Sequence, residues 1–151
     1  MSPAQSTIHA SAVLVGAHAL LIQGPSGSGK SRLALALLQA AQSGELSFSR
    51  LVADDRVLTE AAHGRLLARP APKLAGLIEV RGLGIRQVPY EPVAVIGAVV
   101  ELDAADARRL PEPSSGRIEI AGIKLSRLAV AAGIEPLRFV LAYLKTDDAI
   151  A

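Results

Sequence analysis

The sequence predicts an α/β fold, a P-loop core with a mixed β-sheet. An apolar segment runs into the pattern G-x-x-x-x-G-K-[ST] and then into an alanine- and leucine-rich stretch, the strand–loop–helix order of a phosphate-binding loop. Strand-like segments outnumber helix-like ones, and they do not alternate as the repeated βαβ units of a standard nucleotide-binding domain do. With 151 residues, half of them apolar, the chain is predicted to form one domain over residues 1–151.

The first half of the chain predicts a hairpin, a helix and a short strand, in that order. Ser11–Val15 and Ala19–Gln23 are apolar runs around a Gly-Ala-His turn, which predicts a β-hairpin. The stretch from Gly29 to about Gln42 is rich in alanine and leucine and predicts a helix. Leu51–Ala53 is a short buried strand that ends at two aspartates.

Beyond the aspartates, strands are separated by turns that glycine and proline mark. The predicted strands are Arg56–Leu58 and Arg65–Ala68, which pair as a hairpin, then Leu77–Val80, Val93–Leu102, Ile118–Ile120 and Ile123–Leu125. Residues 68–76 and 108–116 are loops because of their prolines and glycines. A terminal helix is predicted over Pro136–Lys145, with its proline near the start.

Composition excludes several classes of protein. There is no cysteine, which rules out disulfides and thiolate metal sites. No apolar run approaches the roughly 20 residues of a membrane span, and no signal peptide is visible, so a cytoplasmic protein is expected. The net charge is only +2, and there is no run of lysine or arginine, which argues against a nucleic-acid partner.

The glycine-rich loop is predicted to hold the phosphates of a nucleotide. Its residues are Gly24, Pro25, Ser26, Gly27, Ser28, Gly29, Lys30 and Ser31. Glycines let the backbone curl so that its N–H groups point at phosphate oxygens, Lys30 reaches the β- and γ-phosphates, and the Ser31 hydroxyl is placed to ligate Mg²⁺. The chain contains no asparagine, so it lacks the N-K-x-D stretch with which many GTPases read guanine, and ATP is the expected nucleotide.

Asp54 and Asp55 follow a buried strand, where adjacent side chains point to opposite sides. One of them can face the phosphate loop, and a carboxylate there either holds the metal or takes a proton from an incoming hydroxyl. Alternation leaves open which aspartate takes which role, and Asp54 is the candidate for the metal. The alternative is a turn with two solvated aspartates.

Alternation along Leu77–Val80 places Glu79 and Arg81 on one face of the strand. Glu79 could complete a Mg²⁺ shell with Ser31, or it could form an ion pair with Arg81 on an exposed strand.

The position of His9 relative to the first hairpin suggests a role for this histidine. If the first hairpin turns around Ala17, His9 lies opposite Pro25 at the mouth of the phosphate loop, where it could touch phosphate; the alternative is an exposed strand-end histidine.

Four segments together resemble the catalytic domain of bacterial HPr kinase/phosphorylase: "IHASAVLVGAHALLIQGPSGSGKS", "LVADDRV", "GLIEVRGLGI" and, more loosely, "ARRLPEP". The resemblance implies a P-loop fold similar to phosphoenolpyruvate carboxykinase, and a hexamer. It implies an enzyme that uses ATP and Mg²⁺ to phosphorylate a serine of HPr, a small phosphocarrier protein, and that can remove the phosphate by phosphorolysis.

The resemblance also implies roles for individual residues. Lys30 corresponds to the P-loop lysine, Ser31 and Glu79 to Mg²⁺ ligands, and Asp55 to the acceptor of the serine proton. His9 and Arg109 correspond to an active-site histidine and arginine. The family's P-G-R-N-like segment, tied to dephosphorylation, and its N-terminal domain have no counterpart, so kinase activity is better supported than phosphorolysis. A non-catalytic ATP-binding regulator and a P-loop small-molecule kinase are the alternatives.

Overall fold

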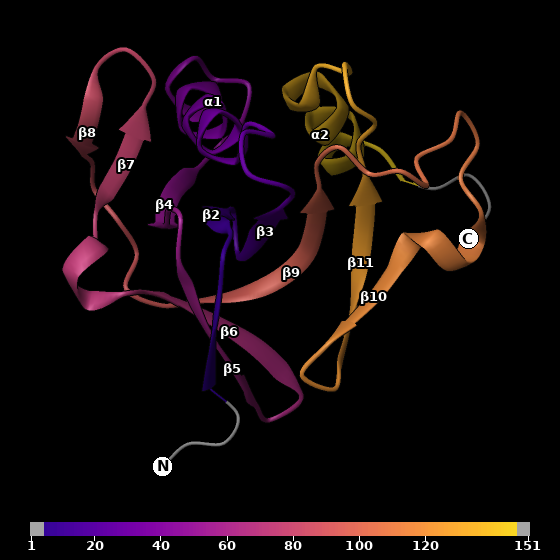
Figure 1. The fold of residues 1–151 in the computed structure, drawn as a ribbon, viewed down its shortest axis with the longest axis horizontal. Helices are drawn as coiled ribbons and strands as arrows, with labels where there is room; N and C mark the ends of the chain where they lie inside the picture. The colour runs from indigo at the N-terminus through magenta and orange to yellow at the C-terminus, as the bar shows by residue number, and fades with distance from the viewer. Residues whose placement is uncertain (1–4, 148–151) are drawn as a thin grey trace.

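The computed structural model describes residues 5–147. Strands β3 (His18–Gln23) and β9 (Ala94–Glu101) form the centre of the fold (Figure 1). They belong to a nine-stranded sheet whose main order is β1-β5-β6-β9-β3-β2-β4, with β11 also paired to β9 and β10 paired to β11. The other strands of this sheet are β1 (Gln5–Ile8), β2 (Ser11–Val15), β4 (Ser49–Ala53), β5 (Val57–Ala62), β6 (Arg65–Pro70), β10 (Arg117–Ile120) and β11 (Ile123–Ala129). Because β3, β9 and β11 run parallel while most other pairs are antiparallel, the sheet is mixed, as predicted.

The three parallel strands end at one edge of the sheet, and two helices lie beside that edge (Figure 1). Helix α1 (Lys30–Gln42) follows β3 through the phosphate loop, and helix α2 (Pro136–Lys145) follows β11. Ligands of α/β proteins bind outside the carboxyl ends of parallel strands. The topology therefore places the sequence motif where a ligand site is expected.

Hydrogen bonds join the segments that leave these strands. The Leu102 N–H donates to the Gln23 carbonyl at 2.8 Å, and the Val130 N–H donates to the Glu101 carbonyl at 2.9 Å. The Ala104 N–H in turn donates to the Val130 carbonyl at 2.9 Å. The start of the phosphate loop and the two following segments thus form one connected surface.

Alternating residues of β3 pack into two apolar layers, one on each face of the sheet. Leu20 and Ile22 face the layer that α1 and α2 close, whereas Ala19 and Leu21 face the layer formed with β5 and β6. Burial on both faces explains why this strand is almost wholly apolar. No helix within residues 5–147 has the length and apolarity that a bilayer crossing requires.

Most predicted elements are confirmed, with corrections at the edges. The first hairpin pairs Ser11 with Ile22, so the expected register, which would pair Ser11 with Gln23, is wrong by one residue. Strand β1 was not predicted, nor was β8 (Gly84–Gln87), which pairs with β7 (Leu77–Val80) in a separate two-stranded sheet. The predicted loops contain the short 3-10 helices η1 (Pro72–Leu74) and η2 (Pro113–Gly116).

Candidate active site

The phosphate loop leaves β3 and curls directly into α1. Gly24 has φ +155°, and a Cβ there would lie 2.6 Å from the Ser28 hydroxyl oxygen and 3.0 Å from the Leu102 Cβ. Only glycine fits this position without displacing the backbone of Leu102. Gly29, with φ 99°, precedes the helix, and no side chain caps the first turn. Its uncapped N–H groups, with no acidic residue in that turn, suit an anion.

Lys30 and Ser28 are two polar residues of this loop. The Lys30 ammonium donates to the Gly24 carbonyl at 2.9 Å and to the Pro25 carbonyl at 3.1 Å. The Ser28 hydroxyl oxygen is buried and has no hydrogen-bond partner among residues 5–147. A buried hydroxyl normally has a partner, so the loop presents a vacant donor and a positive charge that fit a phosphate group.

Asp54 lies at the bottom of the loop and accepts hydrogen bonds from three directions. The Ser31 hydroxyl lies 2.8 Å from both carboxylate oxygens, the Ser11 hydroxyl donates to Oδ1 at 2.6 Å, and the Glu79 N–H donates to Oδ2 at 3.1 Å. The side chain of Ser11 is fully buried, and Asp54 is 5% exposed. Strand β7 and the start of β2 thus hold the carboxylate against the loop serine.

Ser31 and Asp54 fit a divalent cation. Within residues 5–147 no lysine or arginine forms an ion pair with Asp54, so its buried negative charge is met only by hydrogen bonds. Buried charges are usually paired or coordinate a metal. No cluster of three or more acidic or histidine side chains in the described part forms a metal site by itself. Mg²⁺ typically takes one or two protein oxygens and completes its shell with water and phosphate, which matches this pair.

Asp55 points away from Asp54, as the strand-end argument predicts, and meets His9. The His9 Nε2 and Asp55 Oδ1 atoms are 3.0 Å apart, and both side chains are exposed. Asp55 has φ 69° and sits at the centre of a tight turn in which the Arg56 N–H donates to the Asp54 carbonyl at 2.8 Å. Such left-handed backbone is strained, and strain of this kind is concentrated at functional sites. This turn directs the Asp55 carboxylate toward solvent, beside the mouth of the phosphate loop.

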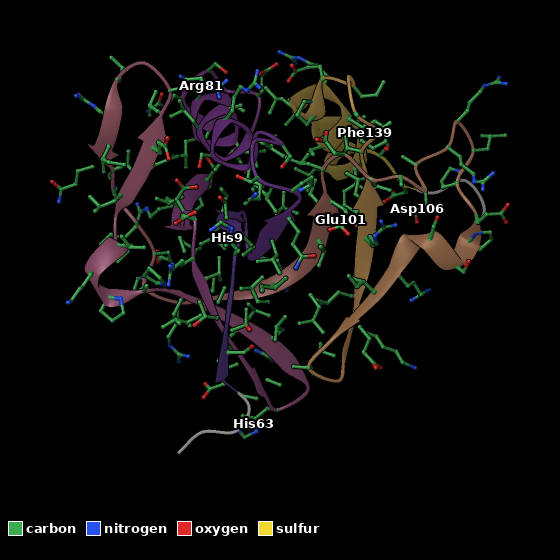
Figure 2. All side chains as sticks on the ribbon, in the orientation of Figure 1. His9, His63, Arg81, Glu101, Asp106 and Phe139 are labelled. Carbon is green, nitrogen blue, oxygen red and sulfur yellow. The ribbon has the colours of Figure 1, made fainter. Side chains whose placement is uncertain are left out.

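His9 lies at the mouth of the phosphate loop although the predicted hairpin register is wrong. It lines a recess of about 420 Å³ together with Gly24 and Pro25. Figure 2 shows the labelled His9 in the middle of the molecule, far from His63, which occupies the turn between β5 and β6. The recess therefore joins the phosphate loop to the His9–Asp55 pair.

Glu79 takes the exposed face of β7, with Ile78 and Val80 packed toward the core. Its backbone, and not its carboxylate, contacts Asp54. Within residues 5–147, Glu79 forms no ion pair with Arg81. The role of Glu79 as a metal ligand stays a prediction. The role of Arg109 also stays a prediction: this residue is exposed in the segment between β9 and η2, and it lines neither the recess beside His9 nor the pocket on the other side of the phosphate loop.

The arginine that does reach the recess is Arg127, which the sequence did not single out. It projects from β11, is 12% exposed, and donates to both carboxylate oxygens of Asp106 at 2.9 Å each. It also donates to the Ser115 carbonyl at 3.0 Å and lies 3.8 Å from Glu101. Figure 2 shows Glu101 and Asp106 near the upper ends of β9 and β11. Arg127 thus ties the segment after β9 to the wall of the recess.

These bonds also shift protonation. The hydrogen bond from Arg127 lowers the pKa of the Asp106 carboxyl, and the same bond raises the pKa of the Arg127 guanidinium. A carboxyl with a lowered pKa in the folded state stabilises the fold at neutral pH. That contribution is lost as the pH falls through the lowered pKa.

We expect Arg127→Ala to lower the free energy of unfolding by about 1–3 kcal/mol, because it removes a mostly buried side chain that satisfies three acceptors. Arg117→Ala, which removes an exposed arginine of β10, is the matched control and should change stability by less than about 0.5 kcal/mol. Urea unfolding of both variants measures the difference. Equal stabilities would show that Arg127 does not hold the recess wall.

Comparison with known proteins places this geometry in a family. The family model for the HPr Serine kinase C-terminal domain matches residues 2–91. An HPr kinase/phosphorylase of Streptococcus thermophilus is 32% identical over 142 residues, which cover 83% of this chain and 42% of that protein. One from Clostridium tetani is 34% identical over 106 residues, covering 66% of this chain and 32% of that protein. The chain thus spans less than half the length of these relatives.

A solved structure shares the fold. The structure of the Hpr(Ser) kinase/phosphatase from Coxiella burnetii superposes with a TM-score of 0.75 at 20% sequence identity and covers 93% of this chain and 94% of that chain. At this identity the likeness concerns the fold, and it confirms the predicted α/β class. Because the family model covers more than half of the chain, including the phosphate loop and both aspartates, the chain belongs to the HPr Serine kinase C-terminal domain family.

Proposed function

We propose that this chain is an ATP- and Mg²⁺-dependent kinase that phosphorylates a serine of an HPr-like phosphocarrier protein. One observation carries the proposal: the phosphate loop, the Ser31–Asp54 pair and the Asp55–His9 pair lie together at the carboxyl end of β3. The phosphate loop can bind phosphate, the Ser31–Asp54 pair offers oxygens to a hard cation, and the exposed Asp55 carboxylate can accept a hydroxyl proton. HPr is proposed as the acceptor of the phosphoryl group because the relatives are named HPr kinase/phosphorylase.

In this mechanism ATP supplies the γ-phosphoryl group, and the residues of the chain position it. Lys30 would exchange its contacts with the Gly24 and Pro25 carbonyls for phosphate oxygens, and Ser31 and Asp54 would hold the cation, which would offset the charge of the phosphates. The serine oxygen of the acceptor bonds to the γ-phosphorus as the bond to the bridging oxygen breaks and ADP leaves. Asp55 takes the serine proton, and His9 orients the carboxylate.

The direct test is incubation of the protein with Mg-ATP and an HPr-like protein, followed by mass spectrometry of the acceptor. A phosphoserine that forms only with both ATP and Mg²⁺ supports the proposal. Addition of inorganic phosphate to the product then tests phosphorolysis, the reverse activity that the relatives' name includes. If ATP binds but no acceptor serine is modified, a non-catalytic ATP-binding regulator becomes the better account.

Glu79→Gln should raise the Mg²⁺ concentration needed for half-maximal transfer by about tenfold, the scale on which residues around a metal change its affinity. The amide keeps the shape of the side chain but loses the charge that a hard cation prefers, while the backbone bond to Asp54 is unchanged. Binding of ATP without metal should stay the same. Glu119→Gln, at an exposed position of β10, is the control. A parental Mg²⁺ response in both variants would remove Glu79 from the metal site.

A further inference from the structure

A further recess lies at the end of the sheet opposite the phosphate loop. It has a volume of about 450 Å³ and is bordered by the β5–β6 turn, the β10–β11 turn and the starts of β3 and β9. Figure 1 shows these two turns at the lower end of the sheet, whereas α1 and α2 lie at its upper end. Strand β3 begins at this recess with His18 and ends at the phosphate loop after Gln23. The volume is within the range of small-ligand sites.

Basic residues line this recess without an acid among them. Arg65 at the start of β6, Lys124 on β11 and His18 all line it, and no aspartate or glutamate is among its described lining residues. Within residues 5–147 none of the three forms an ion pair. Glu119 is the register partner of Lys124 on β10, but no ion pair joins these two described residues. A concave surface with charges of one sign concentrates ions of the opposite sign.

Side-chain alternation brings the three basic residues to one face of the sheet. Each is followed in the chain by a residue buried in the apolar layer formed with β5 and β6: Ala19, Leu66 and Leu125. Because adjacent side chains of a strand point to opposite faces, His18, Arg65 and Lys124 share the other face. Helices α1 and α2 cover that face near the phosphate loop, whereas at the recess all three residues are exposed.

Gly97 gives the recess its floor. Strand β9 has an extra residue relative to β3 between Ile96 and Ala98, so Gly97 forms a bulge in the centre of the sheet. A Cβ on Gly97 would lie 2.8 Å from the Cβ of His18 and 3.2 Å from its Cγ. Glycine at this position therefore lets the imidazole lie against the backbone of β9. The bulge and the glycine together hold His18 in the recess.

We propose that this recess binds the phosphate group of a small organic phosphate, with Arg65, Lys124 and His18 as donors to its oxygens. A guanidinium matches two oxygens of a phosphate at once, and an ammonium adds a point charge. A phosphate group alone is smaller than the recess, and the remaining space, bordered by Ala17 and Val95, suits an organic part. The proposed kinase function does not enter this inference, because the recess shares no lining residue with either hollow beside the phosphate loop.

The test follows backbone amide signals by NMR during titration with phenyl phosphate. Glycine signals report on the two ends of the sheet separately, since Gly64 and Gly97 line the recess whereas Gly27 and Gly29 belong to the phosphate loop. We expect saturable shifts of the Gly64 and Gly97 signals. Inorganic phosphate, which lacks the organic part, and succinate, a dianion without phosphate, should each bind there at least about threefold more weakly.

Variants test whether the basic residues form the site. Arg65→Ala and Lys124→Ala should each weaken the binding of phenyl phosphate at the recess about tenfold, the worth of a hydrogen bond from a charged donor, and His18→Ala about threefold. Both charged side chains are exposed, so the fold should be kept. Arg86→Ala, which removes an exposed arginine of β8, is the matched control and should leave the affinity unchanged.

Several outcomes would overturn the inference. It fails if the Gly64 and Gly97 signals do not respond to phenyl phosphate, or if inorganic phosphate or succinate binds there as tightly. It also fails if Arg86→Ala weakens binding as much as Arg65→Ala does, because binding would then reflect net charge alone. The response of Gly27 and Gly29 to Mg-ATP tests the phosphate loop in the same samples, so failure of the recess and failure of the proposed function are distinguishable.

Discussion

We expect Asp55→Asn to reduce phosphoryl transfer to the serine of an HPr-like protein by about 10²–10⁴-fold, the scale of general-base loss. Mg-ATP affinity should stay close to that of the parent, since Asp55 points away from Ser31 and Asp54, the proposed cation ligands. Asparagine tolerates the left-handed backbone at φ 69° and can still accept from His9 Nε2, so the turn is kept while the proton acceptor is lost. Phosphoserine formation by mass spectrometry and nucleotide affinity by calorimetry measure the two effects separately.

Asp54→Asn is the matched comparison, because it changes the neighbouring carboxylate in the same way. Its amide replaces a buried acceptor of the Ser31 and Ser11 hydroxyls. We therefore expect it to lower Mg-ATP affinity, which Asp55→Asn should leave unchanged. Parental transfer by the Asp55 variant would show that this carboxylate is not the base.

Lys30→Ala should lower Mg-ATP affinity by about ten- to a hundredfold, the worth of a hydrogen bond from a charged donor. It should lower transfer further, by about 10²-fold or more, because charge on the phosphoryl oxygens develops in the transition state. The domain should stay folded, since among residues 5–147 the ammonium donates only to the carbonyls of Gly24 and Pro25 at the loop.

Lys73→Ala provides the control for Lys30. It removes the same charge from an exposed position in η1, away from the phosphate loop. Calorimetry with Mg-ATP and thermal unfolding should both match the parent. Unchanged ATP affinity and persistent transfer in the Lys30 variant would contradict the proposed phosphate site.

The parts of the site that follow from local sequence could be predicted. The strand, the glycine loop and α1 are contiguous in the chain, and Asp54 and Asp55 follow a neighbouring strand. Side-chain alternation predicted that the two carboxylates face opposite sides, and the family resemblance indicated which of them is the proton acceptor. The buried face of β7 could also be predicted, because side chains alternate between the two faces of a strand.

The parts that depend on distant segments could not. Arg127 is one arginine on a short strand, and its partners Asp106 and Glu101 lie in other elements, so no local pattern marks it. Strand β8 is exposed at all four positions and shows no alternation. The register of the first hairpin depends on a two-residue turn after Val15, and a shift of one residue there was enough to mispair the strands.

The position of β9 has a consequence for how the protein folds. The family match ends at residue 91, before β9 begins, yet β9 pairs with β3 along the strand that carries the phosphate loop. Parallel pairing of segments so far apart in the chain requires closure of a long loop before any contact is gained, and such topologies fold slowly. We therefore expect the pairing of β3 with β9 to form more slowly than the local hairpin of β2 and β3, so that the strand carrying the phosphate loop is completed by a segment from beyond the matched half.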